Sequence, residues 1–193
     1  MTRSAFDEIL ADEYSVAEEA SRIGSTVIAE FPDVHGHLEA ATIGYLFRDD
    51  EVRDKETKVV NASAHLVSQL ISGAGAKYFN RYLKWALQQQ LGFLPTFLIL
   101  IDRNGWKGGD FRWKKFLVDH ELEHCIQKVN DDGFPRVNQV TGEPVWGIKP
   151  HDLEEFEGAI QRNGLVTEEH RSMAAVMVDA AIRDANDAKL TAA

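Results

Sequence analysis

The stretch D-H-E-L-E-H-C, residues 119–125, contains two histidines four positions apart and a glutamate directly after the first of them. On a helix, residues four apart lie on one face, so His120 and His124 can bind one Zn²⁺ through their imidazoles. Glu121 then stands where a general base would take a proton from zinc-bound water as that water attacks a carbonyl carbon. The pattern therefore predicts a hydrolytic zinc site.

The helix that would carry this motif has two apolar faces. At about 100° per residue, one face collects Val118, Leu122 and Cys125. His120 and His124 fall almost opposite, and their neighbours on that side are Trp113, Phe116 and Leu117. A helix that lies between a packed layer and the floor of a cleft shows this pattern. The alternative is that both histidines are ordinary core or surface residues. We expect Cys125, on the core face, to be a small buried hydrophobe rather than a ligand.

A catalytic zinc needs a third protein ligand, with the last position left to water. His151 is the best-placed candidate, because 27 residues (151 − 124) are enough for the chain to reverse and return to the first helix. Glu154 and Glu155 stay open as alternatives, since one class of zinc peptidase uses a glutamate on a downstream helix. Glu155 can instead form a capping box with Asp152. The sequence therefore favours His120, His124 and His151 as the metal ligands.

The other candidate residues have simpler interpretations. His35 and His37 lie beside a glycine in an expected loop, where we expect solvated side chains. His65 and His170 lie in expected helices, where a surface or hydrogen-bonded histidine is the ordinary case. Asp119 directly precedes the first ligand, and we expect its carboxylate to orient a zinc-bound imidazole without binding the metal itself.

The two histidine segments together resemble a known family. D-H-E-L-E-H-C followed by H-D-L-E-E-F-E-G-A-I-Q-R-N-G-L resembles the putative phage metallopeptidase family, and the strand segments I-G-Y-L-F-R and L-I-D-R-N-G-W fit the same pattern. The resemblance covers roughly Thr42 to Gly164. The arrangement is also similar to SprT-like proteases, whose third ligand is a histidine that opens a helix in an H-G-x-x-F context. Here Asp152 replaces the glycine and Phe156 falls one place later. The resemblance implies a cytoplasmic, zinc-dependent peptidase of minimal zincin type.

Local patterns predict an α+β fold: a small sheet packed on the helix that carries the histidine motif, with extra helices at both ends. We expect a single domain over residues 1–193, with a core at about 42–164 and helical additions at 4–30 and 167–187. The expected helices span residues 4–30, 62–72, 76–90, 110–130, 152–163 and 167–187, the expected strands span 41–48 and 94–102, and a hairpin is expected around 141–144. Residues 103–110 are expected to form a loop.

Composition limits the classes of function. The formal net charge of −10 argues against a general nucleic-acid binder, because phosphates would be repelled on average. One cysteine cannot form an intramolecular disulfide, and the sequence shows neither a signal peptide nor an apolar run that could span a membrane, so we expect a cytoplasmic protein. Segments 77–85 and 112–115 interleave cations with aromatics, which suits a nucleic-acid surface. We favour ordinary amphipathic helices there.

These observations lead to one main hypothesis and two alternatives. The main hypothesis is a zinc-dependent metallohydrolase, most simply a peptidase acting on a protein or peptide, with no membrane partner. The first alternative is a zinc-bearing binding or regulatory protein that acts on a host protein, its metal closed by a fourth ligand such as Glu154 or Glu155. The weakest alternative is a DNA-associated factor that uses the basic helix at 77–85.

Overall fold

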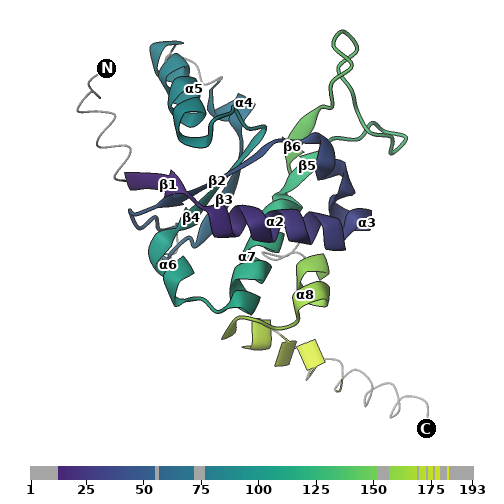
Figure 1. The fold of residues 1–193 in the computed structure, drawn as a ribbon. Coiled ribbons are helices and arrows are strands. Elements are labelled where there is room, and N and C mark those ends of the chain that lie inside the picture. Colours follow the sequence, from purple (N-terminus) through teal and green to yellow (C-terminus); the bar gives the residue numbers. More distant parts are fainter. Residues whose placement is uncertain are drawn as a thin grey trace.

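The computed structural model describes most of the chain. The described residues are 13–54, 57–71, 77–151, 157–168, 170–172, 174, 175, 177, 178 and 182. They form a mixed fold with a four-stranded sheet, a separate two-stranded sheet, and helices that cover both faces of the larger sheet (Figure 1). The α+β class predicted from the sequence is therefore confirmed.

The larger sheet is built around β4, the most apolar strand. Its strands are β1 (Tyr14–Val16), β2 (Ile43–Arg48), β3 (Ala62–Leu66) and β4 (Phe97–Asp102), in the order β1-β2-β4-β3. β2 and β4 run parallel, whereas β1 and β3 are antiparallel to their neighbours. The run F-L-I-L-I in β4 suits a strand that is covered on both faces, and a central place in the sheet provides that environment.

Helices cover the two faces of the sheet. The helices of the described residues are α2 (Glu18–Glu30), α3 (Pro32–His35), the 3₁₀ helix η1 (Gly36–Ala40), α4 (Val67–Leu70), α5 (Lys77–Leu91), α6 (Arg103–Gly108), α7 (Phe111–His124) and α8 (Glu157–Asn163). On one face, Val27 of α2 and Leu122 of α7 join Ile99 of β4 in the main core. On the other face, Leu87 of α5 packs with Leu98 of β4. Alternate side chains of β4 therefore serve two separate apolar layers.

The second sheet follows directly after α7. It consists of β5 (Cys125–Gln127) and β6 (Trp146–Ile148), which pair antiparallel. The intervening chain, residues 128–145, forms the long extension that projects from the body in Figure 1. Isolated bridges pair Val129 with Pro135 and Val137 with Pro144 within it. The hairpin expected around 141–144 is therefore confirmed, as the outer part of a larger structure.

Two predicted elements are wrong over part of their length. Residues 62–66 form strand β3 rather than the start of a helix, because β4 offers an edge for antiparallel pairing and long-range pairing outweighs weak local propensity. Only the four residues of α4 remain of the predicted 62–72 helix, as far as the described residues go. In the N-terminal segment, Tyr14–Val16 pairs with β2 as a strand, which interrupts the predicted 4–30 helix, and helix α2 begins at Glu18. The predicted helical residues 4–12 lie outside the described part.

Two further boundaries differ from the prediction. The segment 103–110, expected to be a loop, contains α6, because Asp102 caps a helical turn by accepting a hydrogen bond from the Gly105 amide at 2.5 Å. Helix α7 ends at His124 rather than at about Asn130, and the next residues pair with β6. The helix expected at 76–90 is confirmed as α5, with bounds Lys77–Leu91.

The C-terminal third agrees with the sequence where it is described. α8 ends before Gly164, whose φ of 73° is the left-handed conformation that favours glycine after a helix. Thr167 caps the following turn by accepting a hydrogen bond from the His170 amide at 3.1 Å. The predicted start of the preceding helix, residues 152–156, lies outside the described residues. Within the described ranges, no helix has the length and apolar character that a membrane span requires.

Candidate metal centre

Helix α7 is the element that holds the first two histidines. Its N-terminus is capped as predicted, because the Asp110 carboxylate accepts a hydrogen bond from the Trp113 amide at 2.8 Å. Val118 and Leu122 are fully buried in the main core, which fixes the rotation of the helix about its axis. The buried side therefore determines the direction in which His120 and His124 point, which is away from the main core.

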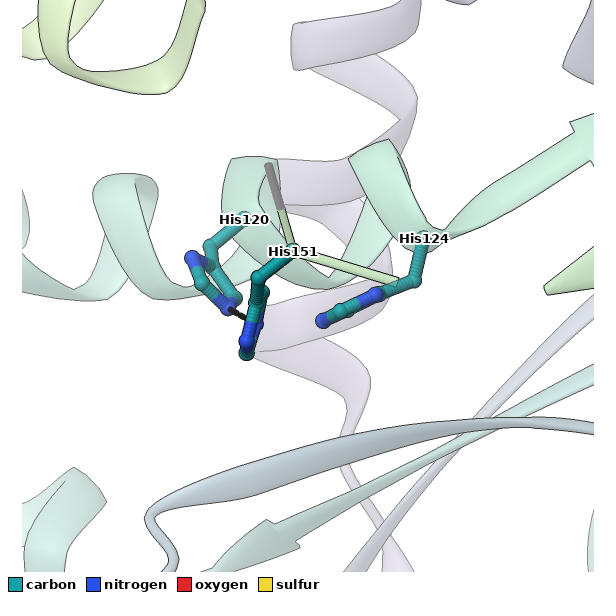
Figure 2. A group of neighbouring side chains, drawn as sticks. All are labelled: His120, His124 and His151. Atoms are coloured by element: carbon teal, nitrogen blue, oxygen red, sulfur yellow. Dashed lines mark hydrogen bonds between the residues drawn. The ribbon is translucent and has the colours of Figure 1, made fainter. Parts of the chain in front are cut away.

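Three histidines come together at this helix. The possible ligand atoms of His120, His124 and His151 all lie within 4.8 Å of one another. Figure 2 shows the three imidazoles gathered on one side of α7, with His151 contributed by the chain that follows β6. Within the described ranges, no other group of three or more His, Cys, Asp or Glu side chains meets the same distance criterion. The structure thus brings together the three residues that the sequence singled out as metal ligands.

The distances fit a metal site. Nε2 of His120 and Nε2 of His151 lie 2.9 Å apart. Two tetrahedral ligands at the usual Zn–N distance would be about 3.3 Å apart, so a movement of a few tenths of an ångström would admit an ion. His120 is 8% exposed, His124 is half-buried and His151 is exposed, so solvent reaches the cluster from the His151 side. A ligand position open to water or substrate is therefore compatible with this geometry.

The hydrogen bonds of His124 determine which nitrogen can bind a metal. Nδ1 of His124 lies 2.6 Å from the carbonyl oxygen of Lys149. A carbonyl can only accept, so Nδ1 carries the proton and Nε2 keeps its lone pair. The Lys149 amide in turn donates to the carbonyl of His124 at 2.8 Å. These two hydrogen bonds between His124 and Lys149 fix the orientation of the His124 ring. They also hold Lys149, two residues before His151, against the end of α7.

Glu121 lies on α7 next to His120 and is 3% exposed. Cys125, one turn later, is fully buried, and its thiol contacts the Glu121 carbonyl oxygen at 3.5 Å. Burial raises the pKa of the Cys125 thiol, and the nearby charge of Glu121 raises it further. The prediction that Cys125 is a small buried residue is confirmed, and a thiol held in its neutral form is a poor metal ligand.

Asp119 is the centre of a buried hydrogen-bond network. Its Oδ1 accepts from Nε2 of His35 at 2.8 Å and from Nη2 of Arg162 at 2.8 Å. Its Oδ2 accepts from Nε of Arg162 at 3.0 Å and from the Asn163 side-chain amide at 2.7 Å. Arg162 also donates to Glu123 at 2.7 Å. The network ties α7 to α3 and α8 in a single polar cluster.

This network changes how Asp119 can act on the metal site. Burial by itself raises the pKa of Asp119, but hydrogen bonds from His35 and Arg162 outweigh it and hold that pKa below its usual range. The four hydrogen bonds use the acceptor positions of the carboxylate, and none of them goes to a histidine of the cluster. Asp119 therefore makes no direct hydrogen bond to the imidazole of His120. It can position His120 only through the backbone of α7.

The remaining histidines differ from the sequence-based expectations. The prediction of a solvated side chain is wrong for His35, which is 1% exposed because it completes the Asp119 network. His37 is half-buried and donates from Nε2 to the Cys125 carbonyl at 2.8 Å, so it too is held by the fold. His65 lies on strand β3 rather than on a helix. His170 does lie in a helical segment, where it is buried against the ring of Phe116.

The cations of segment 112–115 are engaged within the protein, whereas Arg81 and Lys84 of segment 77–85 are exposed. Lys114 pairs with Glu19 at 3.0 Å and Lys115 pairs with Glu30 at 2.5 Å. Arg112 donates two hydrogen bonds to the Asn163 carbonyl. In α5, Leu83 and Leu87 pack against the sheet, as an ordinary amphipathic helix requires. The side chains of Tyr78 and Phe79 lie outside the described part.

Comparison with known proteins gives one match. The sequence model of the family described as "Putative phage metallopeptidase" matches residues 12–182, which extends beyond the segment 42–164 that carries the resemblance. Neither a curated protein nor a solved structure matches the chain.

Proposed function

The chain belongs to the putative phage metallopeptidase family, and from this premise we propose that it is a zinc-dependent peptidase with a zincin-like site. The observation that carries the proposal is the convergence of His120, His124 and His151 on one side of α7. Three neutral imidazoles with one open side form the donor set of catalytic rather than structural zinc. The proposed substrate is a polypeptide, and the cytoplasmic location expected from the sequence stays a prediction.

The chain's own residues divide the work as follows. His120, His124 and His151 would hold Zn²⁺, with the Lys149 carbonyl keeping His124 in the required tautomer. When bound, zinc would supply Lewis acidity, lowering the pKa of water and polarising a carbonyl. Glu121 would accept a proton from the attacking water at its carboxylate and then transfer it to the leaving amine. This assignment of Glu121 rests on its place in the motif and on the family.

The first alternative, a zinc-bearing protein without hydrolytic activity, differs in the number of side chains that bind the metal. It requires a fourth side chain on the metal, and Glu154 and Glu155, the residues considered for that place, lie outside the described residues. The exposure of His151 favours an open position instead. A DNA-associated role would have to rest on α5, because Lys114 and Lys115 are paired with acids of α2, and the formal net charge of −10 gives it less support.

Two measurements on the purified protein test the proposal. Elemental mass spectrometry of wild type and Glu121→Gln should give about one zinc per chain in both, because Glu121 is not a ligand in this proposal. Hydrolysis of an unfolded protein by the zinc-loaded wild type should be lost in Glu121→Gln, since the variant cannot accept the proton. Turnover retained by Glu121→Gln would refute the assigned base. Zinc bound by four side chains in an X-ray absorption spectrum would favour the binding protein.

A further inference from the structure

The extension between β5 and β6, residues 128–145, is an ordered arm that buries almost none of its own side chains. Every residue from Lys128 to Glu143 is exposed. Figure 1 shows the arm projecting away from the two layers of helices that cover the sheet. Exposed connections of this length without helices or long strands are uncommon, and they are usually either functional or disordered.

The arm is held in shape by its own hydrogen bonds. In the first turn, the Asn130 side-chain oxygen accepts from the amides of Asp132 and Phe134 at 3.2 and 2.8 Å. In the second turn, the Asn138 side-chain oxygen accepts from the amides of Val140 and Thr141 at 2.8 and 3.3 Å. These side-chain-to-backbone bonds make turns independently of the core. The shape of the arm is therefore encoded locally and not by packing on the body.

The ordered arm displays apolar side chains to solvent. The exposed apolar residues are Val129 at 56%, Phe134 at 66%, Val137 at 43% and Val140 at 93%. Single exposed apolar residues are normal, but four on one 18-residue projection that adds nothing to the core make the projection a candidate contact surface. Pro135 and Pro144 lack amide hydrogens at the two internal bridges, which disfavours strand-to-strand association with a second arm. Side-chain contacts are thus the means by which the arm would bind.

The base of the arm is continuous with the histidine cluster. The Lys128 amide donates to the Val145 carbonyl at 2.8 Å, which closes the base next to the β5–β6 pair. His124 ends α7 directly before β5, and Lys149 follows β6 directly and bonds to His124 in both directions. The arm is therefore inserted between the second and third histidines. A chain segment bound at the base of the arm would therefore lie near the end of α7, where His124 is located.

Charge indicates the kind of partner. The two turns carry three exposed acids, Asp131, Asp132 and Glu143, while the two exposed bases of the arm, Lys128 and Arg136, lie outside the turns, in a chain whose formal net charge is −10. These acids disfavour anionic membranes and nucleic acids and favour basic side chains. We propose that the arm is a docking element for the polypeptide substrate, holding an extended segment rich in apolar and basic residues beside the histidine cluster. The proposal rests on the proposed peptidase function, because it names the substrate of that site.

The test separates binding from turnover. Zinc-loaded Glu121→Gln, full length, is probed with an array of synthetic 15-residue peptides. The strongest binder is then titrated by fluorescence anisotropy against the same protein carrying Phe134→Ser and Val140→Ser. Because the arm lies outside the core, these changes should leave folding intact, as circular dichroism would verify. The matched control carries Phe111→Ser and Val52→Ser, which remove an exposed phenylalanine (67%) and an exposed valine (44%) elsewhere on the surface.

We expect binders enriched in apolar and basic residues, a Kd weakened about tenfold or more in the arm variant, and no change in the control. In the active protein, the arm variant should raise KM for an unfolded protein while kcat stays the same. Equal peptide affinity with and without the arm changes would overturn the proposal. So would the absence of any peptide binder, arm-dependent binding to anionic vesicles, or arm-dependent dimerisation. Peptide binding through the arm without hydrolysis by wild type would reject the peptidase and keep the docking element.

Discussion

Arg162 donates two parallel hydrogen bonds to Asp119, from Nε to Oδ2 at 3.0 Å and from Nη2 to Oδ1 at 2.8 Å. Asp119 is fully buried and directly precedes His120, whereas Arg162 lies on α8, downstream of His151. The pair therefore connects the helix that carries two histidines to the chain segment that follows the third. We infer that this link sets the spacing of the cluster.

Replacing Arg162 should affect both folding and metal affinity. Arg162→Met leaves the buried carboxylate of Asp119 without its charged partner, and such a loss costs about 3 kcal/mol. Zinc affinity should fall about tenfold, as is typical when groups that orient ligands are removed. Urea unfolding of the metal-free protein and zinc titration with a competing chelator measure the two effects.

Arg53→Met, which removes the exposed pair with Glu51 at 2.6 Å, is the control and should cost under about 1 kcal/mol. Equal losses in both variants would contradict the inferred role of the buried pair.

The identity of the third ligand can be tested by removing one histidine at a time. His151→Ala should reduce bound zinc well below the wild-type content, because two imidazoles alone do not hold a catalytic zinc. His37→Ala is the matched control, since His37 binds the Cys125 carbonyl and lies outside the cluster. Elemental mass spectrometry after dialysis gives the zinc content of each variant. Zinc unaffected by His151→Ala would move the third ligand to Glu154 or Glu155.

The features that were predictable are those whose cause is local in the sequence. The spacing of His120 and His124 places both on one helical side, and the cap at Asp110 marks where that helix begins. The apolar run of β4 marks a strand covered on both faces. Each of these depends on residues a few positions apart, so the sequence pattern carries the information directly.

The features that were missed depend on partners distant in the sequence. Residues 62–66 have no strong strand pattern of their own and become β3 only because β4 accepts them at its edge. The contact between His35 and Asp119 spans 84 residues, and Arg162 approaches Asp119 from a separation of 43. No spacing rule signals such contacts. His35 therefore looked like a loop residue although it is buried.

Gly24 provides a test of how α2 packs on the sheet. A Cβ at this position would overlap the hydroxyl and ring of Tyr45, which is buried in the main core. Gly24→Ala should therefore destabilise the protein by about 1–3 kcal/mol, despite the higher helix propensity of alanine. Gly108→Ala in α6 is the control, because a Cβ there would meet no atom within 4 Å, and we expect it to be neutral or slightly stabilising. Thermal unfolding of both variants decides the comparison, and a stabilised Gly24→Ala would show that α2 does not pack closely on Tyr45.

His65 on β3 should make stability depend on pH in a defined direction. Burial lowers the pKa of its imidazole, so below the unfolded-state pKa of about 6.5 the unfolded chain binds a proton that the folded chain does not. Stability from this residue is thus complete above about pH 6.5 and decreases as the pH falls toward the folded-state pKa, by at most about 1.4 kcal/mol per pH unit. We expect wild type to lose more stability than His65→Gln between pH 7.5 and 5.5. Urea unfolding with a chelator present measures this, because the three clustered histidines then titrate alike in both proteins. Identical losses in the two proteins would mean that His65 is solvated enough to titrate normally in the folded state.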